Sequence, residues 1–186
     1  MKTDRVLMSV VSVLLGLISA ASVQAAPPST LSPGSPVYLG IKGGLMNNDA
    51  QGADYALNLG AYGGYNLLGE GAHIPKNLGG GTLSVEGEFT LTALKGGTRY
   101  YGDWKIMTLA GYAAYRFPLQ NKFYLKGKAG VRWQDIDTGA AVGWNGSDTG
   151  LSFGLGGGLQ LNKANIEAEI TVISSDITFL SLGYIF

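Results

Sequence analysis

The sequence predicts an all-β protein, an eight-stranded antiparallel up-and-down barrel whose strands cross a membrane. Apolar and polar residues alternate with period two in eight segments, which Gly, Asn, Asp and Pro clusters separate. The segments exceed the usual length of globular strands but suit tilted transmembrane strands, which need roughly 9–11 residues. Only 14% of the residues are charged and 30 of 186 are glycine, a composition unlike that of an ordinary soluble domain.

The first 25 residues have the layout of a signal peptide. Two basic residues precede an apolar run that ends near Ile18, and Val23 and Ala25 occupy the positions −3 and −1 of a cleavage site. The alternative is a membrane anchor, but the apolar run is shorter than the roughly 20 residues that a spanning helix needs. We therefore expect residues 1–25 to be removed on export, residues 26–36 to form a flexible lead and residues 37–186 to form the barrel.

The strands follow one another in the order in which the alternation and the turn residues place them. The segment "TLSVEGEFTLTAL" alternates apolar residues with Glu86 and Glu88, and "KFYLKGKAGVRW" alternates them with Lys126, Lys128 and Arg132. In "LSFGLGGGLQL" a row of glycines opposes leucine and phenylalanine and leaves room for long neighbouring side chains. The expected strands are 37–46, 55–67, 82–95, 104–117, 122–135, 149–161, 165–174 and 177–186.

The connectors indicate how the barrel is oriented. Short periplasmic turns and longer outer loops are typical of outer-membrane barrels. Connectors 118–121 and 162–165 fit the short class, and 47–54, 96–103 and 136–148 fit the long class. Connector 68–81 is long for its side, and 175–176 is short for its side. Because the number of strands is even, we expect both termini on the periplasmic side.

A soluble barrel of the lipocalin type is the alternative, with its apolar face turned inward. The polar face argues against it, because Gly, Ala, Ser and Thr predominate there and would make a poor surface in water. The first strand also lacks a G-x-W motif. Aromatic residues gather near the strand ends, as at membrane interfaces. One rim would carry Tyr65, Tyr115, Phe117, Phe123, Tyr184 and Phe186, and the other Tyr55 and Trp133.

The ending "ITFLSLGYIF" places apolar residues at alternate positions up to the last residue: Leu180, Leu182, Tyr184 and Phe186. It resembles the C-terminal signal by which bacterial outer-membrane barrels are recognised and inserted. Together with "VYLGIKGG", "LSVEGEFT", "TLAGYAAYRF" and "FYLKGKAGV", it resembles porin-family proteins with an outer-membrane β-barrel domain, which share the architecture of OmpA/OmpX-type and opacity-type barrels. The resemblance implies an outer-membrane location, insertion by the barrel assembly machinery, and contact with outer-membrane lipid and lipopolysaccharide.

If the apolar face points outward, the charged residues of the strands point into the lumen. An eight-stranded barrel is just wide enough for its side chains to fill, and buried charges are tolerated when they are paired. We therefore expect four acids and five bases to form a structural charge network that plugs the lumen. The alternative is a narrow channel, whose pairs would have to separate. The residues are Lys42, Glu86, Glu88, Arg116, Lys126, Lys128, Arg132, Glu167 and Glu169.

Little in the sequence points to catalysis, cofactors or nucleic acid. The 13 basic and 13 acidic residues leave no basic excess for a nucleic-acid partner, and cysteine is absent. The single histidine, His73, lies in a connector expected on the periplasmic side. Asp135, Asp137, Asn145 and Asp148 have oxygen ligands for Ca²⁺, but loop solubility and turn formation also explain them, and we prefer that explanation. We expect a monomeric, non-enzymatic protein without cofactor or metal, whose outer loops contact an extracellular partner that the sequence does not identify.

Overall fold

The computed structural model describes residues 36–49, 53–67, 81–98, 102–119, 122–138, 146–161 and 164–186. The expected signal peptide, nearly all of the expected lead, and His73 lie outside these described residues. Within the described ranges, no helix is long and apolar enough to cross a membrane.

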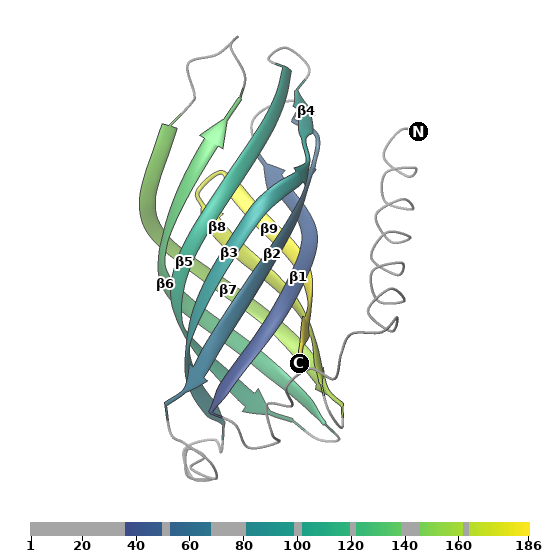
Figure 1. Cartoon of the computed structure of the whole chain (residues 1–186), viewed down its shortest axis with the longest axis vertical. Coiled ribbons are helices and arrows are strands. Elements are labelled where there is room, and N and C mark those ends of the chain that lie inside the picture. The colour runs from purple at the N-terminus through teal and green to yellow at the C-terminus, as the bar shows by residue number, and fades with distance from the viewer. Residues whose placement is uncertain are drawn as a thin grey trace.

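The described strands form one antiparallel sheet that closes on itself as a barrel (Figure 1). Strands adjacent in the chain pair with each other, except β3 and β4; β1 pairs with β9, and β3 pairs directly with β5. The short β4 lies outside the closed ring and pairs with β5 alone, so eight long strands make the barrel, as the sequence predicts. The strands are β1 (Val37–Asn48), β2 (Ala56–Asn66), β3 (Thr82–Leu94), β4 (Gly96–Thr98), β5 (Gly102–Pro118), β6 (Phe123–Asp137), β7 (Gly146–Gln160), β8 (Asn165–Ser174) and β9 (Ile177–Ile185).

We call the end where β1 begins and β9 ends the proximal end, and the opposite end the distal end. At the distal end β5, β6 and β7 run further than expected, and β4 occupies part of a region expected to be a loop. The β6–β7 ladder continues to the pair Ile136↔Gly146, and β4 pairs with β5 as far as Thr98↔Gly102. Both faces of these extensions are largely polar, so the alternation fades although the backbone pairing continues.

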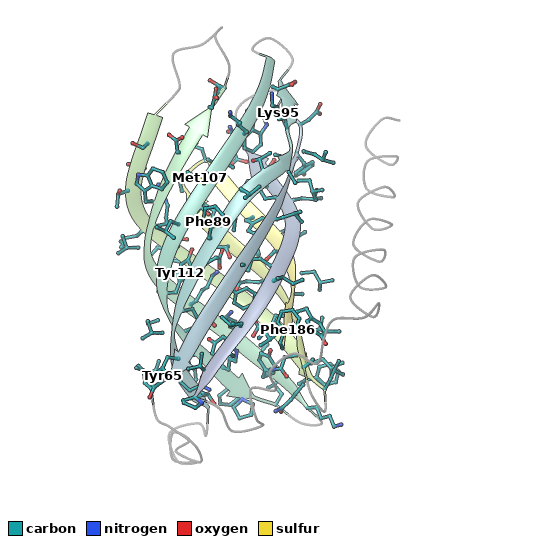
Figure 2. The ribbon with its side chains drawn as sticks, in the orientation of Figure 1. Tyr65, Phe89, Lys95, Met107, Tyr112 and Phe186 are labelled. Atoms are coloured by element: carbon teal, nitrogen blue, oxygen red, sulfur yellow. The ribbon has the colours of Figure 1, made fainter. Side chains whose placement is uncertain are left out.

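The outer face of the barrel is apolar and exposed. Leu155 is 70% exposed, and leucine, isoleucine, valine and phenylalanine side chains cover the outside of the other long strands. This arrangement is the reverse of a lipocalin-type barrel, which would turn the same residues inward. Figure 2 shows Tyr65 and Phe186 towards the proximal end and Lys95 towards the distal end.

Large side chains that point inward lie opposite glycines on the next strand. A Cβ atom built on Gly64 would overlap the ring of Tyr38, and one built on Gly158 would overlap the ring of Tyr124. The glycines therefore provide the volume that the larger side chains fill. The register pairs are Tyr38↔Gly64, Tyr62↔Gly40, Tyr112↔Gly130, Tyr124↔Gly158, Lys126↔Gly156, Lys128↔Gly154 and Arg132↔Gly150.

The distal part of the interior is apolar, which the sequence reading did not foresee. Trp104 is fully buried there, and its Nε1 donates a hydrogen bond to the carbonyl oxygen of Asp54 at 3.0 Å. We call this cluster the apolar cap. It consists of Met46, Ala56, Trp104, Ile106, Ile173, Ile177 and Phe179, with Ile136 packed against it.

A test of the glycine pairing compares two alanine substitutions. Gly158→Ala should lower the free energy of unfolding by about 1–3 kcal/mol, because the new methyl group overfills the space beside Tyr124. Gly111→Ala is the control, since a Cβ there meets no atom within 4 Å. Urea unfolding of the refolded proteins measures both. Equal effects of the two substitutions would contradict the role given to the inward glycines.

Candidate functional site: the charged interior

Three strands each carry two like charges two residues apart: Glu86 and Glu88 on β3, Lys126 and Lys128 on β6, and Glu167 and Glu169 on β8. Since side chains alternate along a strand, both members of each pair point inward at successive levels. Strand β1 adds Lys42, and β5 adds Arg116. All eight side chains are buried except that of Arg116, which is 12% exposed. They form two sets.

The set nearer the proximal end is a closed ring of alternating charge. Arg116 binds Glu86 through Nη2 at 2.7 Å and Glu167 through Nε at 2.8 Å. Lys126 Nζ lies 2.9 Å from Glu86 Oε2 and 3.0 Å from Glu167 Oε2. We call these four residues the proximal ring.

The second set repeats this arrangement one level towards the distal end. Lys42 Nζ lies 2.8 Å from Glu88 Oε2 and 3.0 Å from Glu169 Oε1. Lys128 Nζ lies 2.7 Å from each of the same two oxygens. We call these four residues the distal ring. A longer contact of 3.2 Å between Lys126 Nζ and Glu169 Oε2 joins the two rings.

In each ring every charge has two neighbours of opposite sign. Each ring holds two acids and two bases, so its formal net charge is zero. Burying an ion is costly unless its charge is paired and its hydrogen-bonding groups are satisfied. The closed alternation meets the first requirement for all eight groups, and removal of any one of them leaves its two neighbours undercompensated.

Four inward tyrosines surround the rings. The hydroxyl of Tyr124 donates to Glu167 Oε1 at 2.8 Å, and the hydroxyl of Tyr38 donates to Glu86. The ring of Tyr62 lies 4.9 Å from Lys42 Nζ and 5.3 Å from Lys126 Nζ, so it faces a cation of each charged ring.

Tyr112 completes the set, with Lys128 Nζ 4.1 Å from its ring centre. The sequence analysis gave these tyrosines no role. The sequence feature that could have revealed them is the alternation along the strand. Tyr124 lies two and four residues before Lys126 and Lys128 and therefore shares their face.

Arg132 is the one expected lumen charge that the structure places apart from the rings. Its guanidinium is buried and binds Asp148 Oδ2 at 2.9 Å. Arg132 lies four residues beyond Lys128 on β6, roughly 13 Å along a strand, which is beyond the level of the distal ring. Within the two rings, four bases therefore face four acids, and the fifth expected base, Arg132, pairs with Asp148 instead.

The C-terminal residues lie on the outer face, where β9 closes the barrel against β1. Leu180 and Phe186 are exposed, and Leu182 and Tyr184 are half-buried. The rings of Tyr184 and Phe186 meet edge-on with centres 5.2 Å apart. The backbone N–H of Phe186 donates to the carbonyl of Leu39 at 2.9 Å, which continues the bonding between the two strands.

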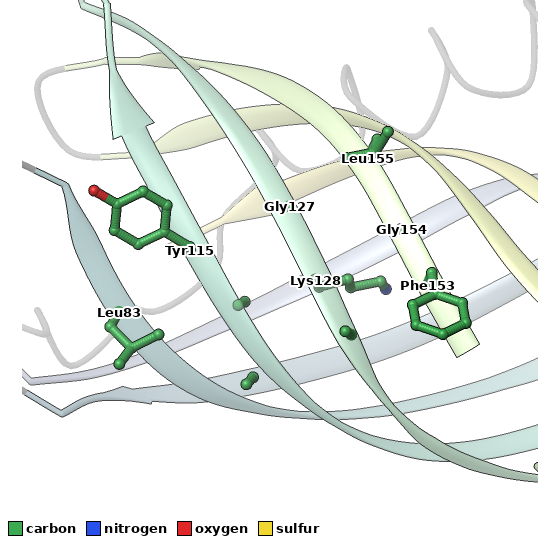
Figure 3. A pocket seen from close by; sticks show the side chains of 10 residues that line it. Leu83, Tyr115, Gly127, Lys128, Phe153, Gly154 and Leu155 are labelled. Carbon is green, nitrogen blue, oxygen red and sulfur yellow. The ribbon is translucent and has the colours of Figure 1, made fainter. Parts of the chain in front are cut away.

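The outer face also has a hollow of about 550 Å³ (Figure 3). Small residues, among them Ala113, Gly127 and Ala129, lie between larger apolar side chains of four strands. Lys128 is the one charged residue in its lining, but its side chain is buried and bound in the distal ring. The hydroxyl of Tyr115 also lies in the lining, which holds no His, Asp or Glu side chain.

Among the described residues, no group of three or more His, Cys, Asp or Glu side chains lies close enough together to hold a metal ion. Of the four residues considered for Ca²⁺, Asp137 pairs with Lys105 at 3.0 Å, and Asp148 pairs with Arg132. Asn145 lies outside the described residues.

Comparison with known proteins identifies the architecture. A family model described as "Outer membrane protein beta-barrel domain" matches residues 12–182. A search of curated protein sequences finds no match.

Among solved structures, the Neisserial surface protein A (NspA) is similar, with a TM-score of 0.55 and 14% identity over 83% of this chain and 98% of that one. The attachment invasion locus protein Ail of Yersinia pestis has a TM-score of 0.46 and 18% identity, over 81% of this chain and 96% of its own. The outer membrane enzyme PagL has a TM-score of 0.49 and 14% identity, over 81% and 98%. At 14% identity the likeness to NspA is one of fold, and fold alone does not decide function.

The ring geometry makes a prediction about charge order at constant net charge. Exchanging two neighbours of the distal ring, by Glu88→Lys with Lys128→Glu, places like charges side by side at two of its four contacts. The exchange should cost several kcal/mol, since breaking a buried pair typically costs about 3–5 kcal/mol.

Inverting the whole distal ring, by adding Lys42→Glu and Glu169→Lys, restores alternation and should recover part of that loss. Urea unfolding compares the two variants. An inverted ring no more stable than the exchanged ring would show that the order of charges does not matter.

Proposed function

Because this chain belongs to the outer membrane protein beta-barrel domain family, we propose that it is a non-enzymatic outer-membrane protein whose lumen is closed. The observation that carries the proposal is the pair of closed, neutral charge rings with the apolar cap beyond them. Ions crossing the barrel would have to part eight mutually bound charges and then pass a buried apolar layer. The barrel then acts as a rigid platform in the envelope.

The proposed orientation has the proximal end and both termini in the periplasm. The tight proximal connections between β5 and β6 and between β7 and β8 support it, as does the extension of β5, β6 and β7 at the distal end, because longer loops face outward in such barrels. The β2–β3 connection is a long exception on the proximal side. Exposed aromatic residues near the proximal strand ends fit an interface with lipid headgroups. They include Tyr65, Phe117, Phe123 and Phe186.

We assign the interaction role to the distal loops, which would meet lipopolysaccharide and an extracellular partner. The apolar outer face contacts membrane lipid and needs no second subunit to cover it, so the proposed state is a monomer. Leu180, Leu182, Tyr184 and Phe186 form the proposed signal for the barrel assembly machinery.

The proposal excludes an enzymatic role on chemical grounds. The described acids of the two rings are all bound to bases, so none is placed to act as a general acid or base on a substrate. A membrane-facing catalytic site would need a nucleophile with a nearby base. The hollow on the outer face offers the hydroxyl of Tyr115, but its lining has no His, Asp or Glu side chain to act as that base.

A narrow channel is the second candidate, and one observation favours it. Five buried polar atoms of the interior lack a hydrogen-bond partner among the described residues, and two of them, Glu86 Oε2 and Glu169 Oε2, still lie within ion-pair distance of Lys126. The other three are Asn58 Nδ2, Glu88 Oε1 and Gln134 Oε1. Buried groups of this kind are commonly satisfied by water. Water at this level would hydrate part of the route from the distal ring towards the apolar cap.

Planar-bilayer conductance with a lysine double variant separates the two candidates. The refolded wild-type protein should show no stepwise current. Lys126→Met with Lys128→Met removes one base from each ring, and loss of a buried partner typically costs about 3–5 kcal/mol. The urea midpoint should therefore fall clearly.

Lys105→Met is the control, because its pair with Asp137 is largely exposed and such pairs contribute about 0–1 kcal/mol. An unchanged urea midpoint in the double variant, combined with a cation-selective current, would reject the plug in favour of the channel.

The proposed assembly signal predicts unequal effects of two single-residue deletions. Deleting Phe186 should lower the amount of heat-modifiable barrel in outer membranes, because it removes the last aromatic residue and its hydrogen bond to Leu39. Deleting one residue from 27–35 should leave that amount unchanged. Gel mobility before and after boiling measures folded barrel. Equally harmless deletions would argue against the signal.

A further inference from the structure

The backbone ladder between strands β7 and β8 ends before β7 reaches the distal end. The β6–β7 ladder runs all the way to Ile136↔Gly146, but the β7–β8 ladder stops at Phe153↔Val172. In the described part of the chain, Gly146–Ser152 thus has no backbone ladder partner on the β8 side. Strand β8 instead turns at Ser175 and Asp176 into β9.

Arg132 bridges the two strands where the ladder is missing. It reaches from β6 across Gly150 of β7, and its Nε donates to the carbonyl of Ile173 on β8 at 2.6 Å. Its Nη1 donates to the carbonyl of Asp148 on β7 at 3.2 Å, and Nη2 donates to Asp148 Oδ2 at 2.9 Å. The guanidinium therefore satisfies one backbone carbonyl on each side of the gap.

The carbonyl of Ile173 on β8 can accept this bond because the sheet is irregular at that residue. The β8–β9 register shifts between Val172 and Ser174, so Ile173 has no register partner on β9. A bulge of this kind leaves one residue out of the ladder. One further bond joins the two strands on the proximal side of Arg132, where Ser152 Oγ donates to the carbonyl of Val172 at 2.8 Å.

We propose that side chains, chiefly Arg132, join β7 to β8 at the distal end where no backbone ladder does, and we call this contact the side-chain seam. At the seam the two strands separate while the rest of the barrel stays closed. Between the other neighbouring long strands the ladder bonds are backbone bonds, with a register shift at Leu57/Asn58 between β2 and β3 and an end at Leu91↔Met107 between β3 and β5, and the loss of one side chain removes none of them. At the seam one residue supplies three of the described connections. Ile173 also belongs to the apolar cap, so the seam opens onto apolar interior surface.

The test is hydrogen–deuterium exchange of the refolded protein with Arg132→Met. Amides in residues 170–174 should exchange at least about tenfold faster, the factor that corresponds to ~1.4 kcal/mol, because bonds to a charged donor are lost. Amides at the level of the rings, in residues 86–90 and 126–130, should keep their wild-type rates.

Lys105→Met is the matched control. It removes a distal ion pair between β5 and β6, where the ladder continues to Lys105↔Asp137, and it should change no rate at the seam. If Arg132→Met does not fold, Gly150→Ala serves instead, because its new methyl group would lie 3.1 Å from Nη2 and crowd the guanidinium. Unchanged exchange in residues 170–174, or a uniform increase over all strands, would overturn the seam.

Discussion

The narrowness of an eight-stranded barrel is the constraint on which the rest of this structure depends. The interior holds side chains and little else, so each large inward residue needs a small one beside it. Glycine opposite tyrosine, lysine or arginine meets that need repeatedly along the sheet. Within such a confined space, charges of opposite sign must touch, and the two closed rings are the arrangement that leaves none of the eight without a partner.

The interior is divided along the barrel axis into two chemically different parts. The proximal part is held by ion pairs and tyrosines, and the distal part by the apolar cap. Ion pairs demand defined geometry, whereas apolar packing tolerates small adjustments. The proximal part therefore specifies the register of β1, β3, β5, β6 and β8, and the cap excludes water at the end where the strands diverge.

The sequence predicted the strands well because period-two alternation is strong wherever one face is apolar and the other polar. It also placed Glu86, Lys126 and Glu167 on the inner face, since each shares its phase with a second charge two residues on. It did not predict which charges meet, because Lys42 and Arg116 join the rings through the registers of strands distant in sequence.

The apolar cap escaped prediction for a different reason. In β9, Phe179 points inward and Leu180 outward, so both faces are apolar and alternation cannot tell them apart. Arg132 is buried inside the barrel, and one of its partners depends on a bulge at Ile173 that has no clear sequence signature.

The pairing of glycines with bulky residues also bears on how this sequence can change over generations. An enlarged side chain at Gly154 would meet the stem of Lys128, so it becomes tolerable only after that lysine has shortened. Shortening the lysine first opens a void beside Glu88 and Glu169, whereas enlarging the glycine first forces an overlap. Substitutions at such positions should therefore occur in pairs, at two residues that face each other on neighbouring strands, with the larger residue changing first. Residues of the barrel interior would be substituted in pairs, while residues on the lipid-covered outer face would be substituted one at a time.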